Sequence, residues 1–121
     1  TIDPTDSRAL AVVAARTADD KQGRDVVVLD VGNVLAIDEF FVVVDAPNRR
    51  LVKTIVDEVE AGVKAASGRS PNRIEGGSEQ QWVLVDYGDF VVHVFLDETR
   101  RFYEIERLYR DVPTVDWSAA D

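Results

Sequence analysis

The sequence predicts an α/β sandwich with one mixed sheet of about five strands and three helices. Two patterns support this fold class: three segments repeat apolar residues at helical spacing, and short β-branched or aromatic runs lie between them. The size agrees, because 121 residues with 45% hydrophobic and 31% charged side chains fit one globular domain.

The first helix is predicted from its capping pattern. Asp3 is a residue type favoured at the N-cap, and Pro4 fits the first helical position, where its missing N–H needs no partner. Apolar spacing then extends the helix over residues 7–21. Gly23 follows where a left-handed residue often ends a helix.

Two strands are expected next. Residues 25–31 form a β-branched run with almost no polar alternation, which is typical of a central strand covered on both faces. Residues 37–45 form a second β-rich run. Gly32 and Asn33 can adopt positive φ between the runs, so the two strands are expected to pair as an antiparallel hairpin with a longer loop.

A second helix is predicted over residues 49–66. Asn48 is a good N-cap, and Gly68 is placed to end the helix in a left-handed conformation. The apolar residues of its inner face repeat every four positions: Leu51, Ile55, Val59 and Val63. The following residues, 70–80, are expected to be a loop with one short strand at 73–75.

Gly88 and Asp89 predict a two-residue hairpin turn between strands at residues 82–87 and 90–96. That register places three pairs on one face: Trp82 with Phe95, Leu84 with His93, and Asp86 with Val91. The opposite face is almost wholly apolar and is expected to be core: Val83, Val85, Tyr87, Phe90, Val92 and Val94. The face with Trp82, Asp86 and His93 is therefore expected to carry the functional side chains.

The last helix is predicted over residues 99–109, with Thr99 as its N-cap. Its spacing predicts a buried stripe of Phe102, Ile105, Leu108 and Tyr109. Arg100 and Tyr103 are then left on more open surface.

The domain is expected to span residues 1–111. Residues 112–121 contain proline, aspartates and small residues, and they are expected to form a C-terminal tail. We expect this tail to pack only through Val115 or Trp117, if at all.

The composition narrows the class of partner. A formal net charge of −9 disfavours non-specific binding to a phosphate backbone and favours a basic partner.

The absence of cysteine excludes disulfides and thiolate metal sites. No apolar run approaches the ~20 residues of a membrane-spanning helix, and the N-terminus lacks a signal peptide pattern. We therefore expect a soluble, cytoplasmic protein.

The residues offer weak support for catalysis. Asp86 and Asp89 are three positions apart, as in some magnesium sites, but aspartate in a turn more often binds the local backbone. His93 alone is insufficient for zinc, and no nucleophile motif is present. We expect no enzyme activity, no metal and no cofactor, because the aromatic and ionic residues are those enriched in binding surfaces.

The pattern W-x-L-x-D-Y-G-D-x-V-V-H-x-F runs from Trp82 to Phe95. It is followed by Arg100-x-Phe102-Tyr103-x-Ile105-Glu106-x-Leu108, and upstream residues that agree with the same pattern are Asp30, Val31, Asp38, Phe41, Val42 and Val43. Together these residues closely resemble the ribosomal silencing factor family, also called the Iojap-related family. The resemblance covers residues 8–111 approximately.

The resemblance implies an α/β fold that is nucleotidyltransferase-like in shape but lacks the catalytic motif of those enzymes. It implies a factor that binds large-subunit ribosomal protein uL14 and sterically blocks joining of the small subunit, which represses translation under nutrient limitation. It also implies a homodimer when free. From the residues themselves we expect no membrane association and no sequence-specific contact to nucleic acid.

The expected contact or contact-shaping residues are Trp82, His93, Phe95, Arg100, Tyr103 and Glu106. The hairpin that supports them is expected to be fixed by Asp86, Gly88 and Asp89. Two alternatives stay open. One is a magnesium-dependent nucleotidyltransferase-like enzyme that uses the two aspartates, and the other is a dimeric adaptor for a non-ribosomal partner.

Overall fold

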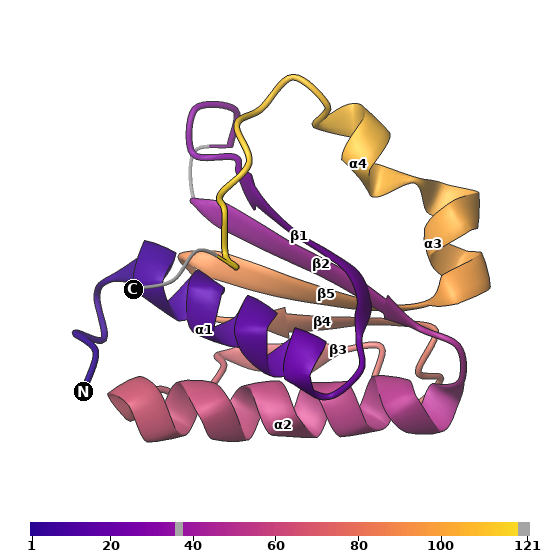
Figure 1. Ribbon diagram of the computed structural model, residues 1–121, viewed down its shortest axis with the longest axis horizontal. Helices are drawn as coiled ribbons and strands as arrows, with labels where there is room; N and C mark the ends of the chain where they lie inside the picture. The colour runs from indigo at the N-terminus through magenta and orange to yellow at the C-terminus, as the bar shows by residue number, and fades with distance from the viewer. Residues whose placement is uncertain (36–37, 119–121) are drawn as a thin grey trace.

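A five-stranded sheet with helices packed against it forms the fold in the computed structural model, which describes residues 1–35 and 38–118 (Figure 1). The elements in chain order are α1 (Ser7–Asp20), β1 (Arg24–Asp30), β2 (Phe40–Ala46), α2 (Arg49–Ser67), β3 (Arg73–Glu75), β4 (Trp82–Asp86), β5 (Phe90–Leu96), α3 (Asp97–Tyr103) and α4 (Ile105–Leu108). The strand order is β1-β2-β5-β4-β3. Strands β2 and β5 are parallel and the other neighbours are antiparallel, which confirms the predicted α/β fold with a mixed sheet.

Helices α1 and α2 cover one face of the sheet and enclose the larger core with it (Figure 1). The caps predicted for α2 are confirmed: Asn48 Oδ1 accepts the Leu51 N–H at 2.9 Å, and Gly68 ends the helix with φ of 82°. The buried side chains of α2 are Val52, Ile55, Val56, Val59 and Val63. The four-residue repeat therefore identified the face that packs on the sheet.

The β4–β5 hairpin has the predicted register, with Trp82 opposite Phe95 and Asp86 opposite Val91. Its apolar face lies in the larger core, where every predicted residue is buried: Val83, Val85, Tyr87, Phe90, Val92 and Val94. The turn begins at Gly88, whose φ of 92° favours glycine.

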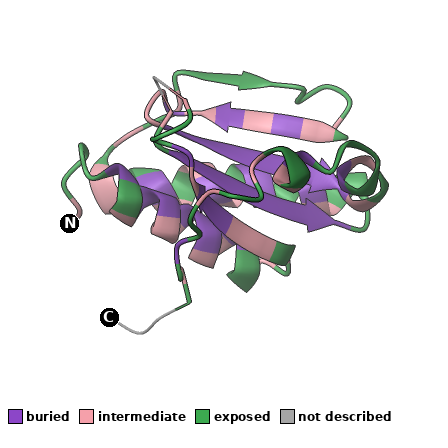
Figure 2. Ribbon diagram, turned by 90° about the horizontal axis from the view of Figure 1, so that it is seen from above, coloured by how far each residue is buried: buried purple, intermediate pink, exposed green. Residues whose placement is uncertain are grey.

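A second, smaller core lies on the opposite face of the sheet. Its buried members are Leu29, Val31, Phe41, Val43, Val91, Phe95 and Ile105. Strands β2 and β5 are consequently buried along their whole length, as the central purple arrows of Figure 2 show. The sheet face that carries Trp82, His93 and Phe95, expected to be open for function, is thus largely covered by α3, α4 and the chain that follows.

Both ends of α1 differ from the prediction. Asp6 rather than Asp3 is the N-cap, because its carboxylate accepts the Ala9 N–H, whereas Asp3 accepts from Thr5 in the preceding turn. At the other end Gln22, with φ of 71°, takes the left-handed conformation expected of Gly23.

Gly23 is needed for a different reason. A Cβ at this position would lie 2.5 Å from a methyl group of Val44 and 2.7 Å from the Ala18 carbonyl oxygen. The glycine therefore lets the chain leave α1 in close contact with the central strand β2.

Strand β1 is an edge strand, not the central strand that was predicted, although its antiparallel pairing with β2 is confirmed. The C-terminal segment covers part of its free edge. Thr114 forms an isolated bridge with Leu29, the Val115 N–H donates to the Val28 carbonyl, and Val115 is buried. The apolar pattern of β1 arises because a segment distant in sequence shields it. The predicted start of the second strand, residue 37, lies outside the described residues.

The single helix predicted over residues 99–109 is wrong. Helix α3 begins two residues earlier, at Asp97, and Glu104 with φ of 47° separates it from α4. This left-handed residue redirects the chain, so the predicted buried stripe is divided. Ile105 is buried, whereas Phe102 and Leu108 are 80% and 78% exposed.

Candidate functional site

Trp82 is the centre of an aromatic cluster beside α3. Its ring stacks on Phe95 with 4.9 Å between the ring centroids, and Tyr103 approaches it at the same distance. The indole N–H donates to Nδ1 of His93 at 3.1 Å. Phe95 and His93 are buried, so within this cluster a partner can reach Trp82 and Tyr103 directly.

The surroundings of His93 fix its protonation state. Burial lowers the pKa of the imidazole to about 4, although the Asp86 carboxylate acts in the opposite direction. Because Nδ1 accepts the hydrogen bond from Trp82, the proton of the neutral ring is on Nε2, which is buried without a hydrogen-bond partner in the described part of the chain. The imidazole and the Phe41 ring meet edge to face, with 4.6 Å between their centroids. His93 is thus a neutral, packed side chain that orients the indole.

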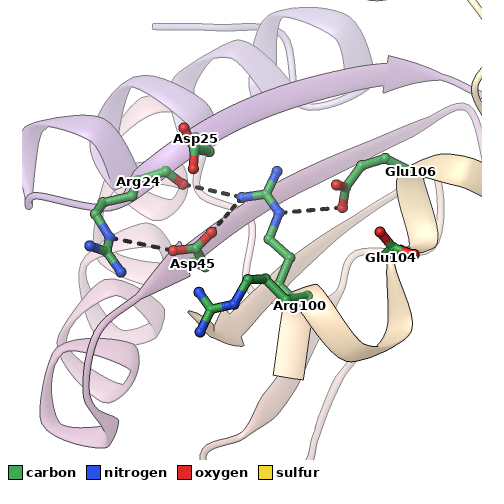
Figure 3. A pocket seen from close by; sticks show the side chains of 7 residues that line it. Arg24, Asp25, Asp45, Arg100, Glu104 and Glu106 are labelled. Atoms are coloured by element: carbon green, nitrogen blue, oxygen red, sulfur yellow. Dashed lines mark hydrogen bonds and ion pairs between the residues drawn. The ribbon is translucent and has the colours of Figure 1, made fainter. Parts of the chain in front are cut away.

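Arg100 ties α3 to the sheet within an open, charged pocket of about 670 Å³ (Figure 3). Its Nη1 donates to Asp45 at 2.9 Å and to the Arg24 carbonyl at 3.2 Å, while Nε donates to Glu106 at 3.3 Å. The side chains of Arg100 and Asp45 are only 9% and 8% exposed, so they form a buried ion pair. Most of the guanidinium's hydrogen-bonding capacity is therefore spent inside the protein.

Asp45 is a functional candidate that was not predicted from the sequence. Its signal was a lone carboxylate in the otherwise apolar strand β2. A buried charge requires a partner of opposite sign, so this position implied a cation packed against it. The sequence did not show that this cation is Arg100, 55 residues away.

Asp86 and Asp89 hold the far end of the hairpin. Asp86 accepts the Gly88 N–H at 2.8 Å and lies 3.1 Å from Arg73 Nε. Asp89 accepts two hydrogen bonds from Arg69, at 2.9 and 3.0 Å. These contacts fix the turn between β4 and β5, the two strands that carry Trp82, His93 and Phe95.

The same contacts bear on the magnesium alternative, because each of the two aspartates already has an arginine partner. Asp38 lies near Asp86, and burial together with the Asp86 carboxylate raises its pKa. Within residues 1–35 and 38–118, no group of three or more metal-binding side chains is assembled.

Phe102, Tyr103 and Leu108 form an exposed apolar segment on α3 and α4; Tyr103 is 53% exposed. Figure 2 shows these two helices mainly in green, which marks exposed residues. Phe102 and Leu108 were not predicted to lie on the surface, because a continuous helix over residues 99–109 would bury them. No glycine or asparagine at position 104 signalled the break.

Comparison with known proteins gives a consistent result. A family model described as ribosomal silencing factor during starvation matches residues 4–121. A ribosomal silencing factor of Halalkalibacterium halodurans is 34% identical over 110 residues, which cover 91% of this chain and 93% of that protein. A ribosomal silencing factor of Bacillus subtilis is 32% identical over 109 residues, covering 90% and 92% of the two chains.

Solved structures agree with these sequence matches. A crystal structure of a Chromobacterium violaceum protein has a TM-score of 0.81 at 32% identity and covers 85% of each chain. A crystal structure of a Bacillus halodurans protein has a TM-score of 0.76 at 33% identity, covering 90% of this chain and 98% of that one. The similarity in both sequence and fold therefore extends over most of each molecule. Among the described helices, none has the length and apolar character needed to cross a bilayer.

Proposed function

This chain belongs to the ribosomal silencing factor family, and from that premise we propose that it binds ribosomal protein uL14 on the large subunit and sterically blocks joining of the small subunit. Its effect is to repress translation when nutrients are limiting. The family match over residues 4–121 is the observation that carries this proposal. The net charge of −9 supports it, because opposite charges speed encounter with a basic ribosomal protein.

The mechanism proposed here is occupancy, without a chemical step. The residues assigned to direct contact have accessible side chains: Trp82, Tyr103 and Glu106. The residues assigned to shaping that surface from beneath are buried: His93, Phe95 and Arg100. The hairpin contacts of Asp86, Gly88 and Asp89 support the strands on which the aromatic residues lie.

This division of roles follows from burial. Phe95 is fully buried under Trp82, so it acts through the position of the indole. Arg100 acts in the same way, because its bonds to Asp45 and Glu106 hold α3 and α4 against the sheet. We also propose that the protein is cytoplasmic and forms a homodimer when free, and sedimentation equilibrium of the purified protein tests the dimer.

A subunit-joining assay tests the proposed function. Purified large and small bacterial ribosomal subunits are mixed with and without the protein, and the products are separated on sucrose gradients. We expect the protein to co-sediment with large subunits and to reduce the joined ribosome peak. Elongation on preformed ribosomes should be unchanged, because the blocked surface is already covered there.

Two results would contradict the proposal. Equal joining with and without saturating protein would exclude the anti-association function. Inhibition of preformed ribosomes to the same extent would show that the protein acts on a later step of translation.

A further inference from the structure

A shallow hollow beside α3 combines two aromatic rings with a carboxylate. It has a volume of about 340 Å³, and its lining residues are Gln81, Glu98, Thr99, Phe102 and Tyr103. The rings of Phe102 and Tyr103 meet edge to face, with 5.0 Å between their centroids. Phe102 is the more exposed of the two, so its ring is available to a partner.

The charge at this hollow is not neutralised within the protein. In the described part of the chain, Glu98 is exposed and has no ion-pair partner. Its neighbour Asp97 pairs with Arg24 at 2.9 Å and lies 3.8 Å from Arg101. Arg101 lines the charged pocket around Arg100 and is not among the residues that line this hollow.

We propose that this hollow receives an arginine or lysine side chain from the basic protein partner, with the cation against Phe102 and Tyr103 and close to Glu98. An aromatic face attracts a cation through its quadrupole, and a nearby carboxylate adds a direct charge interaction. This inference rests on the proposed function and adds the chemistry of the anchor. It assigns a binding role to Phe102 and Glu98.

The same features argue against a phosphate group as the occupant. A phosphate would approach an unpaired carboxylate on a chain whose net charge is −9, and both interactions are repulsive. A cationic side chain is attracted both by the unpaired carboxylate and by the net negative charge. The hollow therefore fits a basic protein surface and not an RNA backbone.

Binding of purified bacterial large subunits by the full chain tests the inference, with affinity measured over a series of salt concentrations. Phe102→Leu keeps an apolar side chain but removes the ring, and we expect it to weaken binding about tenfold. Phe102→Trp restores a ring and should bind within twofold of wild type. Because Phe102 is 80% exposed, both variants should unfold at the wild-type temperature.

The charge is tested with a matched pair of variants. Glu98→Gln should weaken binding about threefold and flatten its salt dependence, because it removes the unpaired carboxylate. Asp20→Asn changes the net charge equally at an exposed position outside the hollow, at the end of α1, and should leave affinity within a factor of about 1.5. Leu108→Ala is the apolar control, since Leu108 is also exposed but does not line the hollow.

The outcomes separate the two proposals. If wild type binds large subunits and Phe102→Leu and Glu98→Gln bind equally well, the anchor is wrong while the proposed function stands. Tighter binding by Glu98→Gln would indicate an anionic surface opposite the hollow and would also overturn the anchor. If wild type does not bind large subunits at all, the proposed function fails and the inference fails with it.

Discussion

The buried, neutral state of His93 predicts a specific dependence of stability on pH. The perturbation is a change of pH from 7 to 4, applied to wild type and to His93→Gln. Glutamine has no titrating group, and its amide oxygen can still accept the hydrogen bond that Trp82 donates to Nδ1 at 3.1 Å. The difference between the two proteins therefore isolates the imidazole.

The magnitude follows from two pKa values. The imidazole has a reference pKa of 6.5, which burial lowers to about 4 in the folded protein. Above pH 6.5 the ring is neutral in both states, so it gives no pH dependence. Between pH 6.5 and 4 the unfolded chain alone binds the proton, so the free energy of unfolding falls as pH falls, by about 1.4 kcal/mol per pH unit. The total loss through His93 is about 3 kcal/mol.

Urea unfolding at half-unit steps of pH, followed by circular dichroism, measures this effect. Wild type should lose stability relative to His93→Gln as pH falls below 6.5, and the two curves should become parallel below pH 4. Carboxylates titrate in both proteins and cancel in the difference. Parallel curves from pH 7 to 4 would refute the reasoning, because they would mean that His93 titrates equally in the folded and unfolded states.

Three substitutions test the other contacts of the site. Arg100→Met removes the buried cation that lies 2.9 Å from Asp45 and leaves only the half-exposed Arg24, 3.5 Å away. It should lower the free energy of unfolding, measured in urea, by about 3 kcal/mol. Gly88→Ala places a Cβ 2.9 Å from Asn72 Nδ2, at a residue whose φ of 92° is unfavourable for alanine. It should lower the free energy of unfolding by about 1–2 kcal/mol. Trp82→Ala removes an indole packed on neighbouring rings, so it should destabilise the fold by about 2 kcal/mol and weaken large-subunit binding by a similar amount.

Each of these three substitutions has a control that separates the proposed cause from a general loss of stability. Adding Asp45→Asn to Arg100→Met removes the buried carboxylate charge that Arg100 no longer neutralises and should recover part of the loss. No recovery would mean that the Arg100–Asp45 ion pair is not the cause. Gly77→Ala should leave the stability unchanged, because the added Cβ would lie 4.0 Å from its nearest neighbour, a methyl group of Ile74. An equal loss of stability at both glycines would contradict the special role of Gly88 in the turn. A Trp82→Ala variant that unfolds more easily but binds normally would assign Trp82 to the core alone.

Much of the fold could be predicted because its signals are local. Helix α2 follows from a four-residue apolar repeat between Asn48 and Gly68, and the β4–β5 register follows from the turn at Gly88. Residues close in sequence determine both features. The pairing of Trp82 with Phe95 was predictable for the same reason, since strand register decides which side chains face each other, whereas the contact of Tyr103 with Trp82 was not.

The position of β1 was not predictable from its own residues. An apolar run indicates a covered strand, but it does not say whether another strand or a distant segment provides the cover. Here the cover comes partly from Thr114 and Val115, more than 80 residues away. The cap of α1 was missed for a simpler reason, since Asp3 and Asp6 are equally suitable residue types.

By itself, then, the sequence determined helix α2, the β4–β5 hairpin and the strand residues of the aromatic face, because periodicity and turn chemistry act over a few positions. Only the tertiary structure decided which of those residues reach the surface. Asp45 in β2 draws Arg100 inward, and the left-handed Glu104 turns α4 away from the axis of α3. That long-range ion pair and backbone break leave Phe102 and Leu108 exposed, where helical spacing alone would have buried them.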